Sequence, residues 1–362
     1  MAIRNFVNFE ARVKQWFSKM KRFPVVELKE RVSSIFVKAG VDGNDARIMA
    51  DTLVTTDMRG VYSHGVIRCA RYLDCIKVGG IQPANQPIVF NSTANSLQVS
   101  ANGGLGIIAS VKTLDQLLEK AKGQPVSIAT VNHSDHYGAA GYYSMRGADA
   151  GFLTFSMSNT CPLVAPTGGR ASTIGNNPFA YSAPGNKYRA VLFDICMSKV
   201  ASGKIQIAAE EGHAIPDGWI LDREGRPTTN PKEIYNGAIM LPFAEHKGYG
   251  FAVMVEILTG ILAGAAMMSG VHSWNEKPGR DANTGHCFMA INPEFFGGTD
   301  VFKSKIDSMI DELKSCTPMN KDCPVLYPGE LEAIREKDAM ENGVPLPEAS
   351  VAELQRAEKI FF

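Results

Sequence analysis

The segment VNHSDHYGAAGYY, residues 131–143, places side chains that can exchange protons within a few positions of one another. A histidine changes charge near neutral pH, so its ring can donate or accept a proton during a reaction. His136 follows a β-branched run and stands two residues before Gly138, where the missing side chain lets another molecule approach closely. We therefore interpret His136 as a general acid/base at the carboxyl end of a strand. A hydrogen-bonded structural histidine is the alternative.

Two other chemistries fit this segment poorly. Zinc binding by His133 and His136 needs further ligands, and the sequence has neither a His-x-x-x-His helix nor a cysteine pair to supply them. Nucleophilic catalysis by Ser134 needs a positioned base and an oxyanion hole, but neighbouring residues at a strand end point to opposite sides. The sequence therefore predicts no metal site.

A second group of polar side chains lies in RGVYSHGVIRCARY, residues 59–72. In a helix that begins near Ser63, this serine can cap the first turn. His64, Arg68 and Tyr72 are then four residues apart and share one face. An arginine binds a planar carboxylate through two parallel hydrogen bonds. The set suits a small carboxylate substrate, although a solvated polar face with ordinary surface pairs fits the same spacing.

Three further segments are typical of anion or cofactor binding. The long connection VAPTGGRASTIGNNPFAYSAP contains Gly168 and Gly169, and its backbone can cradle phosphates or a nicotinamide edge. His246 and Lys247 precede two glycines at the start of a helix, where a cation and free N–H groups can meet an anion. Asp194 ends the strand AVLFD at the carboxyl edge of a sheet. Each signal is weak alone, since glycine-rich helix starts are common.

The order of the elements predicts how these residues are held. Residues 25–77 show the apolar spacing of helices, whereas from residue 96 onward short β-branched runs alternate with helical ones, which is typical of an α/β fold. GHCFMAIN near the end is typical of a strand, and two helical patterns follow it. Because each amphipathic helix needs a partner for its apolar face, we expect the C-terminal helices to pack on the N-terminal ones.

The composition excludes several classes of protein. Lys plus Arg and Asp plus Glu number 37 each, so no net charge attracts the chain to nucleic acid or to an anionic membrane. The longest apolar run is interrupted by Glu256 and predicts a buried helix rather than a membrane span. The 7 cysteines form no C-x-x-C pair, which favours a reducing compartment, the cytoplasm. Residues 1–24 are basic and amphipathic, and we interpret them as an interfacial or dimer-contacting helix, with organelle targeting left open.

One familiar motif is ambiguous. Gly104, Gly106 and Ala109 satisfy G-x-G-x-x-A between a strand and a helix, as in a dinucleotide-binding Rossmann fold. The fingerprint also requires an acidic residue at the end of the next strand, where this sequence has Asn132. A plain tight turn therefore explains the glycines as well.

Taken together, the motifs resemble the type-2 malate/L-lactate dehydrogenase family, which also contains ureidoglycolate, sulfolactate and 2,3-diketogulonate oxidoreductases. Six motifs occur in order from residue 25 to the C-terminus: DMRGVYSHGVIR, NHSDHYGAAGYY, GNNPFAYSAP, the strand ending at Asp194 with ASGKI after it, IPDGWILDREGRPTTNP and HKGYGFAVMVEIL. The resemblance implies hydride transfer between NAD(P)H and a small 2-keto acid, with malate/oxaloacetate as the first choice of substrate and NAD as that of cofactor. It also implies a non-Rossmann NAD(P)-binding α/β domain, so the fingerprint at Gly104 is set aside.

The resemblance implies roles for individual residues. His136 matches the acid/base of some members and His64 that of others, so the proton donor stays open. Arg68 and Tyr72 match substrate-contacting residues, and Ser63 matches a neighbouring hydroxyl. Asp194 is expected to serve the chemistry as well as the cofactor. From the residues themselves or from the resemblance, the expected cofactor contacts are Gly168, Gly169, Asn177, Asp194, His246, Lys247, Pro328, Gly329 and Glu330. DICMS replaces the family's D-x-A-T-S, which leaves the contacts beyond Asp194 open.

We divide the chain on these grounds. Residues 1–24 are an N-terminal extension, residues 25–95 with 300–362 a helical substrate and dimer domain formed from both chain ends, and residues 96–299 an α/β nicotinamide-cofactor domain. The expected partners are a small carboxylate substrate and a second copy of the chain, with no nucleic acid and no membrane. Two rival functions are a catalytically silent dinucleotide-binding homologue and a zinc hydrolase built on His133 and His136.

Overall fold

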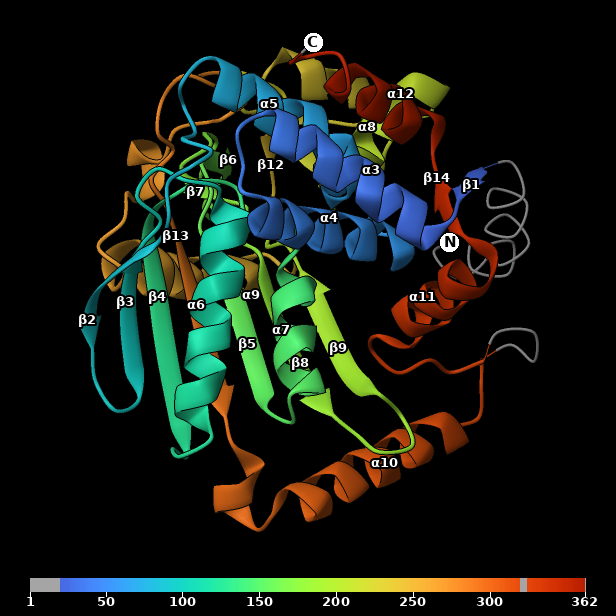
Figure 1. The fold of residues 1–362 in the computed structure, drawn as a ribbon. Coiled ribbons are helices and arrows are strands. Elements are labelled where there is room, and N and C mark those ends of the chain that lie inside the picture. Colours follow the sequence, from blue (N-terminus) through green and yellow to red (C-terminus); the bar gives the residue numbers. More distant parts are fainter. Residues whose placement is uncertain (1–19, 320–323, 362) are drawn as a thin grey trace.

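The structure is a computed structural model that describes residues 20–319 and 324–361, so the predicted role of the first 19 residues lies outside the described part. Helices from both ends of the chain form one layer of the molecule (Figure 1). This layer contains α3 (Val25–Lys38), α4 (Gly43–Met58), the 3-10 turns η1 (Tyr62–His64) and η2 (Val66–Arg68), α5 (Cys69–Lys77), α11 (Glu330–Asn342) and α12 (Glu348–Ala357).

The two chain ends are joined by a common core and by a short sheet. Phe36, Leu53 and Leu354 belong to one cluster of buried apolar side chains. Strand β1 (Lys21–Phe23) pairs antiparallel with β14 (Val344–Leu346), so the helix predicted for residues 1–24 is wrong at residues 21–23, where pairing with a distant strand fixes an extended backbone. Helices α11 and α12 thus lie against the N-terminal helices, because their apolar faces are covered there.

A seven-stranded sheet forms the centre of the molecule, in the order β2-β3-β4-β13-β5-β8-β9. Its strands are β2 (Ile88–Ser92), β3 (Ser96–Ser100), β4 (Val126–Ser134), β5 (Leu153–Ser158), β8 (Phe179–Pro184), β9 (Ala190–Ile195) and β13 (Thr284–Ile291). Within this sheet β3 and β4 run parallel, joined by α6 (Gly106–Ala121), and the other neighbours are antiparallel. Helices α6 and α7 (Ala140–Asp149) cover one face (Figure 1). The predicted α/β fold class is confirmed.

The other face of the sheet packs against a smaller α/β layer. This layer contains β6 (Pro162–Val164), β7 (Ile174–Gly175), α8 (Ser202–Glu211), β10 (Ile220–Leu221), β11 (Pro227–Thr228), η3 (Pro231–Asn236), β12 (Ile239–Met240), α9 (His246–Glu256), the π-helical turn η4 (Ile257–Ile261) and η5 (Met268–Gly270). One apolar core joins Met157 and Cys287 of the large sheet to Val255 of α9. Within residues 20–319 and 324–361, no helix has the length and apolar character to cross a membrane.

One C-terminal helix packs elsewhere. After η6 (Pro293–Phe296), α10 (Thr299–Ser315) runs beside the large sheet rather than within the helical layer (Figure 1). Its Ile310 is buried with Ala183 of β8 and Val191 of β9. The first part of the predicted 300–362 segment therefore covers the sheet, while the division of the chain into domains stays a prediction.

Candidate active site

The segment before α5 consists of η1 and η2, separated by Gly65, so the prediction of a continuous helix from Ser63 is wrong. The cause is the buried Asp57 of α4, whose carboxylate accepts a hydrogen bond from the Val66 N–H at 2.8 Å. A Cβ at Gly65 would lie 1.9 Å from Oδ1 of Asp57, so only glycine allows this approach. The break directs the chain around a buried carboxylate before α5 begins.

His136 lies in the loop between β4 and α7. The start of α6 packs against this loop. Gly106 lies so close to it that a Cβ there would be 2.2 Å from the carbonyl oxygen of Asp135. The Asp135 carboxylate also accepts the backbone N–H of His136. The imidazole then reaches Tyr72 of α5, with 2.6 Å between Nδ1 and the phenol oxygen. The structure therefore brings two of the predicted site residues into direct contact.

The surroundings of Nδ1 decide where the proton of His136 resides. Burial raises the pKa of Tyr72 well above its usual value, so the phenol keeps its proton and donates it to Nδ1. The Gly138 N–H approaches the same nitrogen at 3.3 Å. Because two donors point at Nδ1, the neutral ring carries its hydrogen on Nε2. The Tyr72 hydroxyl has a second acceptor, the His136 carbonyl oxygen, at 3.3 Å.

Trp274 is a site residue that the sequence analysis missed. Its ring stacks on His136, with 4.3 Å between centroids and 12° between planes, and it meets Tyr72 edge-on at 5.2 Å. Trp274 lies between η5 and β13, far from these residues in the sequence, in a polar segment without periodicity. No spacing signal points to it, so tertiary contacts alone identify it.

The guanidinium of Arg68 lies near the Trp274 ring that stacks on His136. Its Nε donates to the carbonyl oxygen of Ser63 at 2.6 Å, which fixes the side chain, and its guanidinium carbon lies 6.0 Å from the centre of the Trp274 ring. In the described part of the chain, no acidic side chain forms an ion pair with Arg68. A half-buried cation without a carboxylate partner is a candidate binding site for an anionic ligand.

His64 forms the other side of this group. Its ring is nearly parallel to that of His136, with 5.5 Å between centroids, and Nδ1 lies 2.8 Å from the Ser63 hydroxyl. Burial and the nearby Arg68 lower the pKa of His64 to about 3. Burial, together with His64 and Arg68, also lowers the pKa of His136 well below its usual value. Both rings are therefore neutral at pH 7 in the free protein.

The predicted cofactor residues near β9 lie around one end of α7. The Asp194 carboxylate accepts the N–H of Gly141, in the first turn of this helix, at 2.8 Å. The Pro328 carbonyl accepts the N–H of Leu192, and a Cβ at Gly329 would be 2.7 Å from the Leu192 side chain. The turn Pro328-Gly329 therefore lies on the strand that carries Asp194. Its neighbour Glu330 instead forms an ion pair with Lys314.

The other predicted cofactor residues lie in the small layer. Gly168 and Gly169 form a turn between β6 and β7. His246 and Lys247 are exposed at the start of α9. Asn177 is fully buried, and its side-chain amide donates to the Glu256 carboxylate at 2.7 Å and to the Ala252 carbonyl at 3.0 Å. The Asn177 side chain thus orients α9, and its predicted contact with a cofactor stays a prediction.

His133 and His136 have different interaction partners. His133 forms an ion pair with Asp281, whereas His136 contacts Tyr72 and Trp274. Over the described ranges, no cluster of three or more His, Cys, Asp or Glu side chains has an arrangement that could hold a metal ion.

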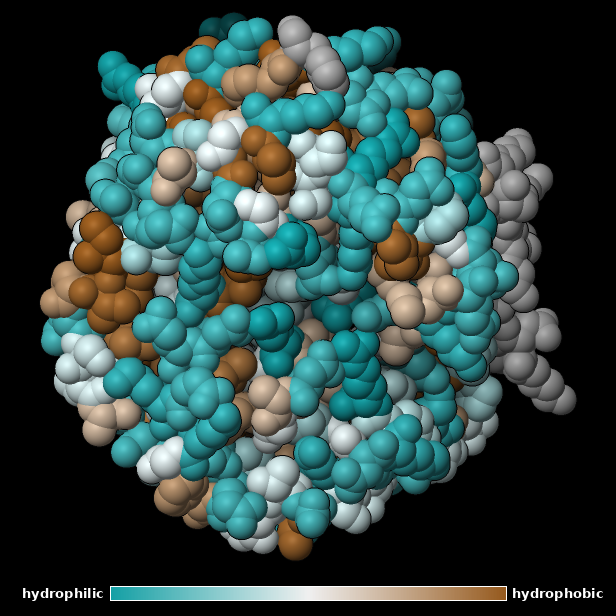
Figure 2. All heavy atoms as spheres, viewed as in Figure 1, coloured by the Kyte–Doolittle hydropathy of each residue, from teal (hydrophilic) through white to brown (hydrophobic). Residues whose placement is uncertain are grey.

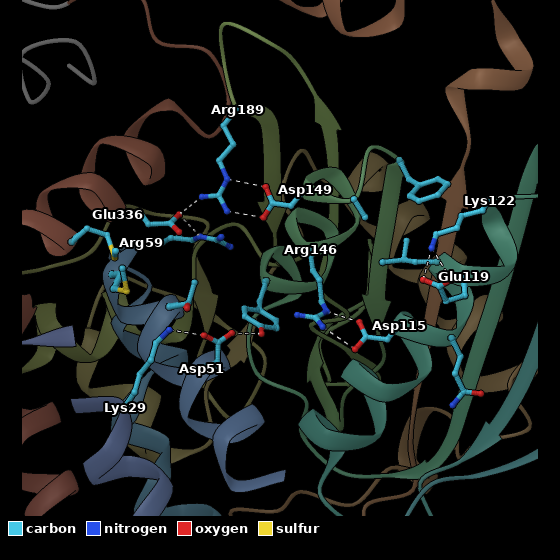
Figure 3. Close-up of a pocket in the computed structure, with 18 residues that line it drawn as sticks. Lys29, Asp51, Arg59, Asp115, Glu119, Lys122, Arg146, Asp149, Arg189 and Glu336 are labelled. Atoms are coloured by element: carbon cyan, nitrogen blue, oxygen red, sulfur yellow. Dashed lines mark hydrogen bonds and ion pairs between the residues drawn. The ribbon is translucent and has the colours of Figure 1, made fainter. Parts of the chain in front are cut away.

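A groove of about 930 Å³ lies between the helical layer and helices α6 and α7, but none of the predicted site residues lines it (Figure 3). Five cationic side chains and five carboxylates line the groove: Lys29, Arg59, Lys122, Arg146 and Arg189, and Asp51, Asp115, Glu119, Asp149 and Glu336. Each of these charges has an opposite partner in the groove. An anion therefore finds no unpaired charge there, unlike at Arg68.

A third histidine, His286 of β13, lies behind the site. It is fully buried, with Nδ1 2.9 Å from the Ser158 hydroxyl and Nε2 2.8 Å from the Ser134 hydroxyl. Its ring stacks on Tyr137, the neighbour of His136, at 4.4 Å between centroids. Burial lowers the pKa of His286 to about 3. Its place in the hydrogen-bonded core indicates a structural role.

The histidine His286 should make stability depend on pH. Its unfolded pKa is about 6.5 and its folded pKa about 3, so the unfolded state alone binds this proton between these values. The neutral His286 therefore contributes fully to the free energy of unfolding above pH 6.5. This contribution is lost as pH falls towards 3, by about 1.4 kcal/mol per pH unit. Urea unfolding of His286→Gln and the unmodified protein at pH 7.5 and 4.5 should show a smaller loss in the variant. Equal losses would mean that His286 is protonated in the folded state.

The fold and the site together define a class of enzyme. A histidine with a defined tautomer, next to an arginine without an acidic partner, is suited to proton exchange on a small anionic substrate.

Comparisons with known proteins identify the family. The family model for malate/L-lactate dehydrogenase matches residues 23–355. Malate dehydrogenase from Pyrococcus horikoshii is 36% identical, covering 93% of this chain and 95% of that protein. Ureidoglycolate dehydrogenase (NAD(+)) from Escherichia coli is 30% identical, covering 88% and 90%. The structure of sulfolactate dehydrogenase from Methanocaldococcus jannaschii superposes with a TM-score of 0.86 at 31% identity, covering 93% of this chain and 96% of that one.

This chain therefore belongs to the malate/L-lactate dehydrogenase family. It is a 2-hydroxy acid dehydrogenase, an oxidoreductase that acts on small hydroxy and keto acids, and its relatives indicate a nicotinamide dinucleotide as cofactor. The resemblance inferred from the sequence motifs is confirmed.

Proposed function

We propose that the protein transfers a hydride between NAD and a 2-hydroxy acid, with malate and oxaloacetate as the substrate pair and His136 as the group that moves the proton. The observation that carries this proposal is the contact between Tyr72 and Nδ1 of His136, beside an Arg68 that has no acidic partner. A substrate carboxylate on Arg68 would place the neighbouring carbon close to the imidazole. The nicotinamide, when bound, supplies or accepts the hydride.

The Tyr72 hydroxyl supports both protonation states of His136. When the ring is neutral, the hydroxyl donates to Nδ1 and Nε2 carries the hydrogen. When the ring carries both hydrogens, Nδ1–H donates to the phenol oxygen, and the hydroxyl turns to the His136 carbonyl oxygen at 3.3 Å. Nε2 can then release its proton to a forming alkoxide, and the reverse sequence accepts the proton of a substrate hydroxyl.

Substrate binding adjusts the charge around His136. The cation Arg68 contributes to the low pKa of this histidine. A carboxylate bound to Arg68 cancels much of this positive charge, so the pKa of His136 rises when the substrate is bound. The histidine thereby becomes a better proton carrier in the complex than in the free protein.

The residues present fit a dinucleotide. Lys247 offers positive charge to a phosphate at the N-terminus of α9, and both His246 and Lys247 are exposed. Gly138 has a φ of 84°, which glycine adopts without strain, and it is buried against Ile107 and Thr52, so it shapes the loop beside His136 rather than opening the backbone to a ring. The carboxylate of Asp194, on β9 beside the turn Pro328-Gly329, offers a polar group for the remainder of the cofactor.

The oligomeric state and the cellular compartment can also be inferred. We infer a homodimer in the cytoplasm. Support for the dimer comes from apolar residues on the edge strand β2, where Ile88, Val89 and Phe90 are 52%, 40% and 53% exposed. In Figure 2, apolar side chains gather over this edge of an otherwise mainly hydrophilic face. Support for a reducing compartment comes from Cys69, Cys75 and the other described cysteines, all of which are free.

A panel of keto acids with both cofactors tests the function. The purified protein should oxidise NADH in the presence of oxaloacetate, more slowly with NADPH, and without added metal. The physical reason is that His136 and Arg68 supply the proton and the anchor, and the cofactor supplies the hydride. Reaction rates are followed by nicotinamide absorbance, with and without a chelator. Activity that a chelator removes and zinc restores would favour a zinc enzyme, and dinucleotide binding without turnover would favour a silent homologue.

A further inference from the structure

A second arginine, Arg71, reaches the same aromatic ring as Arg68. It lies three residues later, on α5, so the two side chains project from neighbouring positions. The guanidinium carbon of Arg71 is 6.0 Å from the centre of the Trp274 ring, as is that of Arg68. Trp274 in turn stacks on His136. Two cations, one at the end of η2 and one on α5, therefore approach the same aromatic ring.

The guanidinium of Arg71 is not satisfied within the protein. Its Nε and Nη2 atoms are buried and have no hydrogen-bond partner. The nearby carboxylates have other partners, since Asp74 accepts both terminal nitrogens of Arg356 and Asp135 accepts the N–H of His136. Across residues 20–319 and 324–361, no ion pair includes Arg71.

Buried donors without acceptors destabilise a fold, and more so when they carry a charge. The chain thus keeps an uncompensated cation next to its binding site. An anion that enters the site would supply the missing acceptors, and a guanidinium favours a planar or trigonal oxyanion that accepts two hydrogen bonds. Arg68 already accounts for one carboxylate of a 2-hydroxy acid. Arg71 is available for another group.

We propose that Arg71 binds a second anionic group of the substrate, a distal carboxylate or sulfonate, and so selects dianionic keto acids over monocarboxylates. The inference rests on the proposed function and adds a specificity-determining residue to it. A monocarboxylate leaves the Nε and Nη2 donors of Arg71 unpaired when it is bound, whereas a dianion pairs them. Discrimination therefore comes from one side chain.

The test replaces Arg71 with glutamine and compares two substrates that differ in the distal carboxylate. The ratio of kcat/KM for oxaloacetate to kcat/KM for pyruvate should fall about 10-fold or more, the size expected for one charge-assisted contact. Arg71→Lys, which keeps the charge without the planar fork, should give an intermediate ratio. Arg47→Gln removes an exposed arginine of α4 and should leave the ratio unchanged. An unchanged ratio in Arg71→Gln overturns the proposal.

A binding measurement separates this inference from the proposed function. Malate and lactate are titrated calorimetrically into the protein without cofactor, so no turnover occurs. Malate should bind more tightly than lactate, and Arg71→Gln should remove most of this difference. Inactivity with every keto acid would reject the proposed reaction, yet the titration would still decide the role of Arg71. Equal binding of the two acids by the unmodified protein rejects the role proposed for Arg71. The same conclusion follows if Arg71→Gln has a normal thermal melt and loses equal affinity for malate and for lactate.

Discussion

Replacing His136 with alanine should lower kcat by about 100-fold or more, the usual contribution of a positioned general acid/base. The imidazole is the group whose Nδ1 is held by Tyr72 at 2.6 Å, which leaves Nε2 to exchange a proton with the substrate. Alanine removes the proton carrier and leaves the Tyr72 hydroxyl without its acceptor nitrogen. Steady-state rates with saturating cofactor and oxaloacetate measure the effect.

The matched control is His64→Ala. His64 has no tyrosine at Nδ1, which contacts the Ser63 hydroxyl, and it lies in the segment that holds Arg68. Its removal should act mainly on KM, because it changes the walls around the bound acid rather than the proton transfer. A large loss of kcat in His64→Ala with nearly normal rates in His136→Ala would reverse the two roles and make the loop after β4 a cofactor-shaping segment.

The substitution Arg68→Lys should raise KM for the keto acid by one to two orders of magnitude. The guanidinium has Nε bound to the Ser63 carbonyl, which orients its terminal nitrogens. A lysine keeps the charge but loses both this anchor and the planar fork that grips a carboxylate, a loss of about 1.5–3 kcal/mol. Initial rates over a range of oxaloacetate concentrations give KM, and circular dichroism checks that the variant is folded.

A similar loss is expected with pyruvate, because both acids have the carboxylate that Arg68 binds. This distinguishes Arg68 from Arg71, whose replacement should affect oxaloacetate more strongly. If KM for every keto acid stays unchanged in Arg68→Lys, the common carboxylate is bound by another residue.

Several features of the protein follow from the sequence alone. The apolar periodicity predicted the helical ends, and the alternation of β-branched and helical runs predicted the α/β fold, because burial of one face leaves a repeating pattern in the chain. The motifs around His64 and His136 predicted the family. Local sequence also marks Arg68 as a candidate ligand for a carboxylate, because a guanidinium can bind a carboxylate through two parallel hydrogen bonds.

The tertiary structure decided what local sequence cannot express. The Asp57 carboxylate accepts the Val66 N–H and so breaks the predicted helix at Gly65. Asp57 lies on α4, outside residues 59–72, so the spacing within that segment gives no sign of it. Trp274 joins the site from a distant loop without periodicity. Arg71 resembles any polar helix residue until its neighbours are seen to have other partners.

The same limit applies to the sheet and to Asn177. Strand β13, late in the chain, inserts between β4 and β5, and periodicity cannot reveal such a neighbour because it records only that a strand is buried. In the sequence, Asn177 lies in a loop and is a candidate ligand contact. In the structure its buried side-chain amide donates a hydrogen bond to Glu256 on α9. Sequence thus marked candidate residues for chemistry and the main helices and strands. Long-range packing and the pairing of buried polar groups decided which of those residues meet, because these energies depend on partners distant in the chain.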